Sequence, residues 1–362
     1  MNAVATLEPV ASLPAARPGF SPTRGWLANR GFDLIFVGGT AGLALTAALG
    51  LSIEAALFGA ILIADLWLLG YHHVIATFAR IAFEPGGLKR HRGLVTWVPL
   101  LVLAGVAGLA AGVGAWTLPT IYLYWQWWHY TRQSYGIAQM YRLKSGHPGR
   151  TLNEMKAVIY ILPFAGILHR SYQSPDEFLG VELKTLPIPL IAVEAAAAVT
   201  VVALAWWGFR QWRAWRAGEL PLAYTFYLLS HLTIFGVGYF AFPSLEHGWL
   251  VINVWHNAQY LLIVWLFNNK RFKDQVDPAQ KLVSMLSQRR NVVRYFAVTL
   301  AVSTVAYITL GGALALASVS ALPLAVVVYQ VINFHHYIVD SQIWKVRRPE
   351  VRTDMGIAQQ AA

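Results

Sequence analysis

Apolar residues dominate ten stretches of the chain, and short polar segments separate them. Each stretch is close to the roughly 20 residues that an α-helix needs to cross about 30 Å of hydrocarbon. The stretches are 32–52, 55–79, 94–114, 117–141, 154–169, 186–209, 221–242, 248–267, 294–317 and 321–344. They predict an all-α fold, a polytopic transmembrane bundle of about ten helices.

The segments outside these stretches predict a simple domain organisation. Residues 1–31 hold four prolines and no apolar core, so we expect a flexible cytoplasmic tail rather than a signal peptide. The transmembrane domain is expected to span 32–345, and 346–362 to form a second cytoplasmic tail. The charged connection 268–293 is long enough for a short amphipathic helix on the membrane surface.

The distribution of charge predicts the orientation of the bundle. The chain has 28 Lys and Arg against 17 Asp and Glu, a net charge of +11. Nearly all of the basic residues lie in the two tails and in every second connection. Cytoplasmic loops carry such an excess, so both termini are predicted in the cytoplasm, in a bacterial inner (plasma) membrane. The positive charge then indicates attraction to anionic membrane lipids and not nucleic-acid binding.

Composition narrows the function classes. Hydrophobic residues make up 57% of the chain and charged residues 12%, half the charge of an ordinary soluble domain. There is no Cys, which excludes disulfides and thiolate metal ligands. No phosphate-binding loop or dinucleotide fingerprint occurs in a credible context.

Histidines recur at one depth of four predicted helices, the second, fourth, eighth and tenth. The segment Val251-Ile252-Asn253-Val254-Trp255-His256 aligns with Val331-Ile332-Asn333-Phe334-His335-His336, and Tyr71-His72-His73 and Trp127-Trp128-His129 share an aromatic-then-His step. This weak repeat predicts two similar four-helix blocks, helices 1–4 and 7–10. At a rise of 1.5 Å per residue, all four segments place their histidines roughly 10 to 21 Å above the cytoplasmic edge.

Ionisable groups inside hydrocarbon are costly and mark functional sites, so the histidine layer predicts a metal site. The candidate ligands are His72, His73, His129, His256, His335, His336, Asp340 and His231. We expect His73, His129, His256 and His336 to bind the metal, with His72, His335 and His231 as additional ligands if there are two metals. Because neighbouring helical residues point about 100° apart, both members of a His-His pair are not expected on one ion.

Polar residues three or four positions from each His lie on the same helix face. Asn253, Asn333, Gln126 and Gln133 are predicted to orient the histidines. For Asp340 three roles stay open: metal ligand, orienting partner or interface residue. Tyr260, Tyr337 and Arg132 are predicted to face substrate or supply protons, and Arg132 needs an anionic partner such as Asp340, Asp65 or a ligand carboxylate.

Imidazole with an added carboxylate and no thiolate favours non-haem iron, mononuclear or dinuclear. The leading hypothesis is a membrane oxidoreductase, an oxygenase that hydroxylates, desaturates or cleaves a lipid-like substrate. An electron-donor protein would supply its reducing equivalents. Two alternatives remain: a haem b electron-transfer protein with axial histidines, and a metal or proton transporter.

The helix with Val254-Trp255-His256-Asn257-Ala258-Gln259-Tyr260 resembles the Trp-His helix of the bacterial Brp/Blh carotene dioxygenase family, with Tyr260 where a second His is expected. That resemblance implies iron held by four helix-borne histidines. More remotely, the chain is similar to the fatty-acid desaturase and hydroxylase group. It lacks that group's histidine pairs at three- or four-residue spacing.

Overall fold

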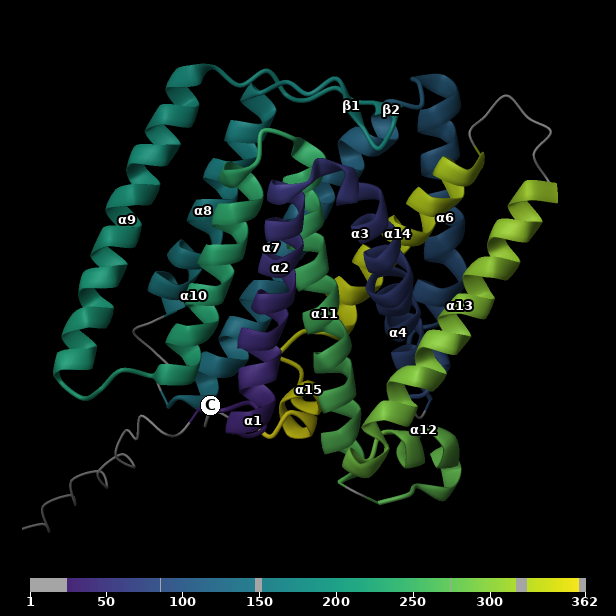
Figure 1. Ribbon diagram of the computed structural model, residues 1–362. Helices are drawn as coiled ribbons and strands as arrows, with labels where there is room; N and C mark the ends of the chain where they lie inside the picture. Colours follow the sequence, from purple (N-terminus) through teal and green to yellow (C-terminus); the bar gives the residue numbers. More distant parts are fainter. Residues whose placement is uncertain (1–24, 85, 147–151, 274, 317–323, 358–362) are drawn as a thin grey trace, which may run out of the picture.

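The computed structural model describes residues 25–84, 86–146, 152–273, 275–316 and 324–357, which form a helical bundle (Figure 1). Strands in this part of the chain are limited to one short antiparallel pair, β1 (Glu177–Phe178) and β2 (Val181–Glu182). The all-α class is therefore confirmed. The first 24 residues of the predicted N-terminal tail and the last five of the C-terminal tail lie outside the described residues.

Long helical segments overlap each of the predicted apolar stretches. They are α1 (Arg30–Asp33), η1 (Leu34–Gly39) and α2 (Thr40–Ile53) in one run; η2 (Ala55–Leu57), α3 (Phe58–Asp65), η3 (Leu66–Gly70) and α4 (Tyr71–Ala82) in a second; α6 (Arg92–Gly112); α7 (Thr117–Lys144); α8 (Leu152–Tyr172); α9 (Leu190–Arg216); α10 (Leu222–Gly236) with η4 (Val237–Ala241); α11 (Leu245–Phe272); α13 (Val292–Leu316); and α14 (Leu324–Ile343). Short helices are α5 (Gly87–Arg90), η5 (Pro278–Gln280), α12 (Lys281–Leu286), η6 (Arg289–Asn291) and α15 (Pro349–Asp354). Six of the long runs are long and apolar enough to cross a membrane. The count of ten spans, the orientation and the two-block repeat stay predictions.

Helix α11 occupies the centre of the bundle. Its most apolar window is 94% buried, against 6–39% for the other five membrane-length runs. It contacts α2, α4, α7 and α10. A helix that is buried on all sides belongs to the core, so α11 is the axis around which the other helices pack.

The outer helices expose large apolar side chains on their outward faces. Leu101 on α6, Val202 on α9 and Ile308 on α13 are each 70% exposed. Soluble proteins rarely expose contiguous apolar patches of more than a few hundred Å². These faces are consistent with an integral membrane protein.

A π-helical segment sets the direction of the first histidine pair. The segment η3 (Leu66–Gly70) interrupts an otherwise continuous helix directly before Tyr71. Such segments add residues to a turn and rotate everything that follows relative to a regular helix. With this rotation Asp65 and His73 both face the central helix α11 through Asn253, Asn257 and Tyr260.

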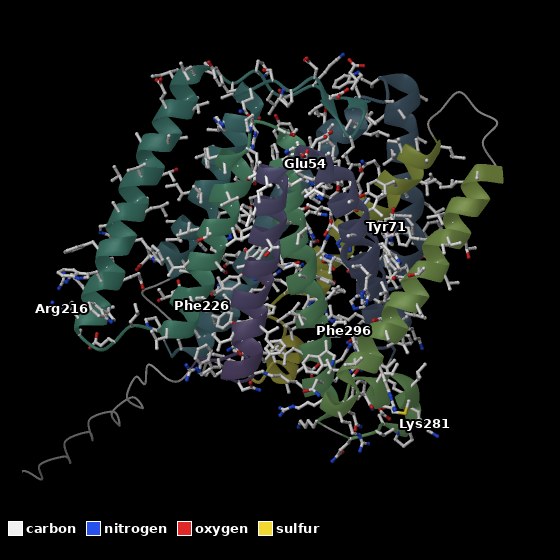
Figure 2. The ribbon with its side chains drawn as sticks, viewed as in Figure 1. Glu54, Tyr71, Arg216, Phe226, Lys281 and Phe296 are labelled. Atoms are coloured by element: carbon white, nitrogen blue, oxygen red, sulfur yellow. The ribbon has the colours of Figure 1, made fainter. Side chains whose placement is uncertain are left out.

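Both described ends of the chain pack at one end of the bundle (Figure 1). Lys144 Nζ donates to the carbonyl of Leu27 over 3.1 Å, and Lys270 Nζ donates to that of Met355 over 2.9 Å. Arg216 and Lys281 also lie toward this end, and Glu54 lies toward the opposite end (Figure 2). Helix α15 thus forms within the predicted C-terminal tail, with Met355 fully buried.

Two glycines allow η4 and α11 to cross with their backbones in contact. A Cβ at Gly248 would overlap the carbonyl oxygen of Gly238. The same carbonyl accepts a 3.0 Å hydrogen bond from Nη2 of Arg170, which is 1% exposed. The crossing therefore fixes α11 against η4 and gives a buried guanidinium its partner.

We expect Gly248→Ala to lower the unfolding temperature of the detergent-solubilised protein. Overpacking costs about 1–3 kcal/mol, more than the roughly 0.5–1 kcal/mol that Ala gains over Gly in a helix. Gly108→Ala on α6, where a Cβ meets nothing within 4 Å, is the matched control and should be neutral or stabilising. Equal unfolding temperatures for the two variants would contradict the close crossing.

Candidate metal centre

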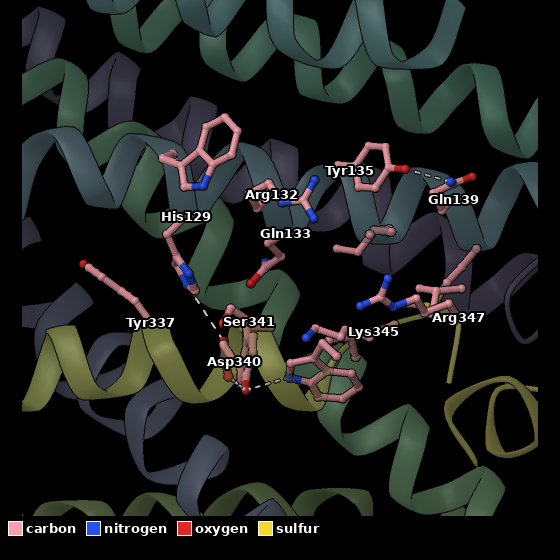
Figure 3. A pocket seen from close by; sticks show the side chains of 18 of the residues that line it. His129, Arg132, Gln133, Tyr135, Gln139, Tyr337, Asp340, Ser341, Lys345 and Arg347 are labelled. Carbon is pink, nitrogen blue, oxygen red and sulfur yellow. Dashed lines mark hydrogen bonds and ion pairs between the residues drawn. The ribbon is translucent and has the colours of Figure 1, made fainter. Parts of the chain in front are cut away.

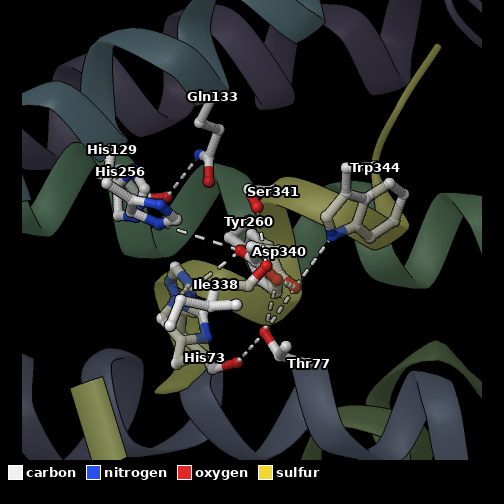
Figure 4. Close-up of polar contacts among 11 residues, drawn as sticks. His73, Thr77, His129, Gln133, His256, Tyr260, Ile338, Asp340, Ser341 and Trp344 are labelled. Atoms are coloured by element: carbon white, nitrogen blue, oxygen red, sulfur yellow. Dashed lines mark hydrogen bonds and ion pairs between the residues drawn. The ribbon is translucent and has the colours of Figure 1, made fainter. Parts of the chain in front are cut away.

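Three histidines and one carboxylate from three helices converge inside the bundle (Figure 4). They are His73 on α4, His129 on α7, and His336 and Asp340, one turn apart on α14. One potential ligand atom from each lies within 4.8 Å of the others, and all four residues are buried. We call these four residues the ligand group.

The spacing within the ligand group suits a single ion. The Nε2 atoms of His73 and His336 are 3.0 Å apart. Asp340 Oδ2 lies 3.8 Å from His129 Nε2 and 3.7 Å from His336 Nε2. Ligands that share one ion at bonds of about 2.1 Å lie about 3.0–4.2 Å from each other, so these atoms need only small shifts.

Asp340 is oriented by hydrogen bonds to one of its two oxygens. Tyr260 Oη donates to Oδ1 over 2.7 Å, and Thr77 Oγ1 donates to the same atom over 3.0 Å. Trp344 Nε1 in turn donates to Tyr260 Oη over 3.0 Å. The arrangement leaves Oδ2 facing the imidazoles, as expected of a ligating carboxylate that is itself hydrogen-bonded.

A ring nitrogen of His129 indicates that an ion fits the ligand group. Its Nε2 is buried and has no hydrogen-bond partner among the described residues. A buried polar atom left unpaired costs about 1–3 kcal/mol. A cation between His129 and Asp340 Oδ2 would remove that penalty, and the donor set of three imidazoles and one carboxylate is chemically suited to hold it.

His256, the fourth predicted ligand, lies beside the ligand group but not within it. Its ring centroid is 4.9 Å from that of His73 and 5.1 Å from that of His129. Its Nδ1 is buried without a partner in the described part of the chain. His256 therefore stays a predicted ligand, on the side of the group that faces Tyr130.

The structure does not bring the other three candidate histidines to the ligand group. His72 Nε2 is 2.6 Å from Thr299 Oγ1 on α13, and His335 Nε2 is 2.6 Å from the carbonyl of Leu94 on α6. His231 has both ring nitrogens engaged, by Ser134 at 3.0 Å and the carbonyl of Ile159 at 3.1 Å. His231 thus joins α10 to α7 and α8, and no second metal site forms from these three.

The residues predicted to orient the histidines bond elsewhere. Asn253 donates to buried Asp65, and Gln126 Nε2 donates to Tyr122 Oη over 2.7 Å. Gln133 and Asn333 donate to the backbone carbonyls of His256 and Tyr329. The groups that the structure shows to orient Asp340 are Thr77, Tyr260 and Trp344. Of these, Thr77 had a signal in the sequence, because it follows His73 by four residues on the same helix face.

A cavity of about 450 Å³ opens from the ligand group between α7 and α14 (Figure 3). His129 and Asp340 line it, as do the three residues predicted to face substrate, Arg132, Tyr260 and Tyr337. The Tyr337 ring stacks on His129 at 4.5 Å. Arg132 donates to Tyr160 Oη over 2.6 Å and forms no ion pair with Asp340 or Asp65.

Comparison with protein-family models, curated proteins and solved structures finds no match to this chain. The chemistry of the site therefore has to be argued from its own residues.

The adjacent histidines allow a sharp test of the ligand group. We expect His336→Ala and His73→Ala to abolish binding of one Co²⁺ per chain, followed by its visible absorption in titrations of purified protein. His335→Ala and His72→Ala are the matched controls and should keep it, because their rings face α6 and α13. Equal loss in all four variants, with unfolding temperatures unchanged, would contradict this assignment.

Proposed function

We propose that this protein is a membrane-embedded metalloenzyme that holds non-haem iron and uses oxygen to modify a lipid-like substrate. One observation carries the proposal: a buried group of three histidines and Asp340 has two of its members, His129 and Asp340, in the wall of a cavity of about 450 Å³. A structural ion would need no such access. The bundle is proposed to lie in a bacterial inner membrane with its basic end in the cytoplasm.

Iron is favoured by the donor set. Imidazoles with one carboxylate and open positions are the ligands of non-haem iron oxygenases, and the chain has no Cys to hold a softer metal. Iron bound here would supply oxygen activation for hydroxylation, desaturation or oxidative cleavage. The cavity side of His129 and Asp340 is where oxygen and substrate would reach it.

The protein's own groups have definable tasks. Thr77 and Tyr260 hold Asp340 in one orientation. Trp344 Nε1 donates to Tyr260 Oη and so holds in place the hydroxyl that donates to Asp340. Aromatic walls, including Tyr337 stacked on His129, keep bulk water from the reacting centre. Electrons would come from a separate donor protein, since no nucleotide or flavin motif is present in the sequence.

The two alternative functions receive less support. A haem between opposed histidines requires a flat slot. Here the ring centroids of the three ligand-group histidines are only 4.6–6.5 Å apart. The small cavity beside His73 and His336 measures about 30 Å³, room for about two waters. A transport path needs polar groups that continue outward, yet Glu194 is exposed on α9, whose packing is mainly with α8.

Purified protein is expected to contain about one tightly held iron per chain by mass spectrometry and to show no Soret band. Asp340→Asn should lose the iron while the unfolding temperature of the metal-free protein stays near that of the metal-free parent. Full iron content in Asp340→Asn would overturn Asp340 as a ligand. A stoichiometric metal other than iron in the parent protein would overturn the iron assignment.

Tyr260→Phe should weaken metal binding by about 10–100-fold, the usual effect of losing a hydrogen bond to a ligand. Competition with a chelator of known affinity measures it. Tyr295→Phe is the control, since that buried hydroxyl accepts from Asn268, about two turns further along α11 than Tyr260. An unchanged affinity in Tyr260→Phe would mean that Asp340 does not ligate.

A further inference from the structure

Three cations line the part of the cavity beyond the ligand group: Arg132, Lys345 and Arg347. Figure 3 shows Lys345 and Arg347 extending toward the space below Arg132. The only acidic side chain in the described lining is Asp340, which belongs to the ligand group. The cavity therefore has a cationic end and a metal-binding end.

The register of the two lining helices sets the distance between these ends. His129 and Arg132 are three residues apart on α7, and Asp340 and Lys345 are five apart across the end of α14. At 1.5 Å per residue Arg132 lies about 4.5 Å along the bundle from His129, and Lys345 and Arg347 follow Asp340 beyond the end of α14. Both helices run toward the end that holds α15, so the cations lie on the same side.

The cations are not neutralised within the described residues. Arg132 donates to the Tyr160 hydroxyl, and Lys345 Nζ donates to the Gln342 amide oxygen over 2.6 Å. None of the three forms an ion pair with another described side chain. Partial burial and the charges of Arg347 and Arg348 lower the pKa of Lys345, which shows how crowded the positive charge is.

Apolar side chains form much of the remaining wall. Trp125, Ile137 and Ile263 line the cavity, and Trp128, 53% exposed, stands at its rim. Ligand pockets of 300–1,000 Å³ commonly combine such walls with a few fixed polar groups. An exposed tryptophan on an outward face gives the apolar part of a ligand a route from the bilayer.

We propose that the cavity binds a single-chain amphiphile whose acidic head, a carboxylate or a phosphate, pairs with Arg132, Lys345 and Arg347. The first part of its chain then lies against His129 and Asp340. This deepens the proposed function, on which it rests for the claim that the bound molecule is the substrate. It places the reacting carbon a few bonds from the head and not near the far end of the tail.

The test is equilibrium binding to the purified full-length chain in phosphatidylcholine nanodiscs, with empty nanodiscs to subtract partitioning. The probes are a long-chain carboxylate, the phosphate monoester and the alcohol of equal chain length. We expect both acids to bind at least about tenfold more tightly than the alcohol, because hydrogen bonds between charged groups are stronger than those of a neutral hydroxyl. The double variant Lys345→Gln, Arg347→Gln should lose that preference, and Arg132→Gln should reduce it.

The matched control is Arg213→Gln with Arg216→Gln, which removes two exposed charges from α9, outside the cavity lining. It should bind all three probes as the parent does. Equal binding of acids and alcohol, or equal loss in the α9 control, would overturn the proposal. Displacement of the bound acid by phosphatidylglycerol at equal molar amounts would overturn the single-chain assignment in favour of a phospholipid head.

Iron content of the same samples separates this proposal from the proposed function. The Lys345 and Arg347 variant should keep its iron, because neither residue belongs to the ligand group. A chain without metal that still prefers acids through these cations would sustain the binding site and refute the metalloenzyme. An iron-loaded chain that binds acids and alcohol equally would refute the acidic ligand and leave the proposed metalloenzyme standing.

Discussion

Burial of Asp340 is the constraint on which the rest of the site depends. A carboxylate among apolar helices is tolerated only when its oxygens have partners. Thr77 and Tyr260 supply them for Oδ1, and Trp344 holds Tyr260 in place. Because these groups come from α4, α11 and the end of α14, one carboxylate ties three helices together and turns its second oxygen toward the histidines.

The central position of α11 follows from the same requirement. A helix that is 94% buried cannot offer a face to lipid, so its polar residues must find partners within the bundle. Tyr260 reaches Asp340 and Asn253 reaches Asp65, on the two sides of His256. The result is two buried carboxylates held by one helix, which also carries His256 between the two contacts.

Much of this was predictable from sequence, because hydropathy and histidine depth are local properties. The apolar stretches gave helices at the expected places, and His73, His129 and His336 do converge with Asp340. The direction of each ring was not predictable. The π-helical segment η3 changes the facing of the His72–His73 pair, and a regular 3.6-residue period does not include such a segment. The roles of the orienting residues were also missed. Spacing places Thr77 beside His73, but its hydrogen bond to Asp340 and that of Trp344 to Tyr260 run between helices, which no spacing rule predicts.

His231 shows why depth alone does not define a ligand. It was expected at the same level as the ligands and is fully buried, yet Ser134 and the Ile159 carbonyl engage both of its ring nitrogens. His129 differs in a single respect: its Nε2 has no partner among the described side chains and faces a carboxylate oxygen. A buried polar atom usually has a hydrogen-bond partner in the protein, and one without such a partner calls for another one, such as a bound ion or water. The cavity that begins at His129 connects this unsatisfied atom to the outside, and α7, which carries His129, also carries Arg132 one turn further on. A ligand held by that arginine is thereby placed against the imidazole by the geometry of one helix.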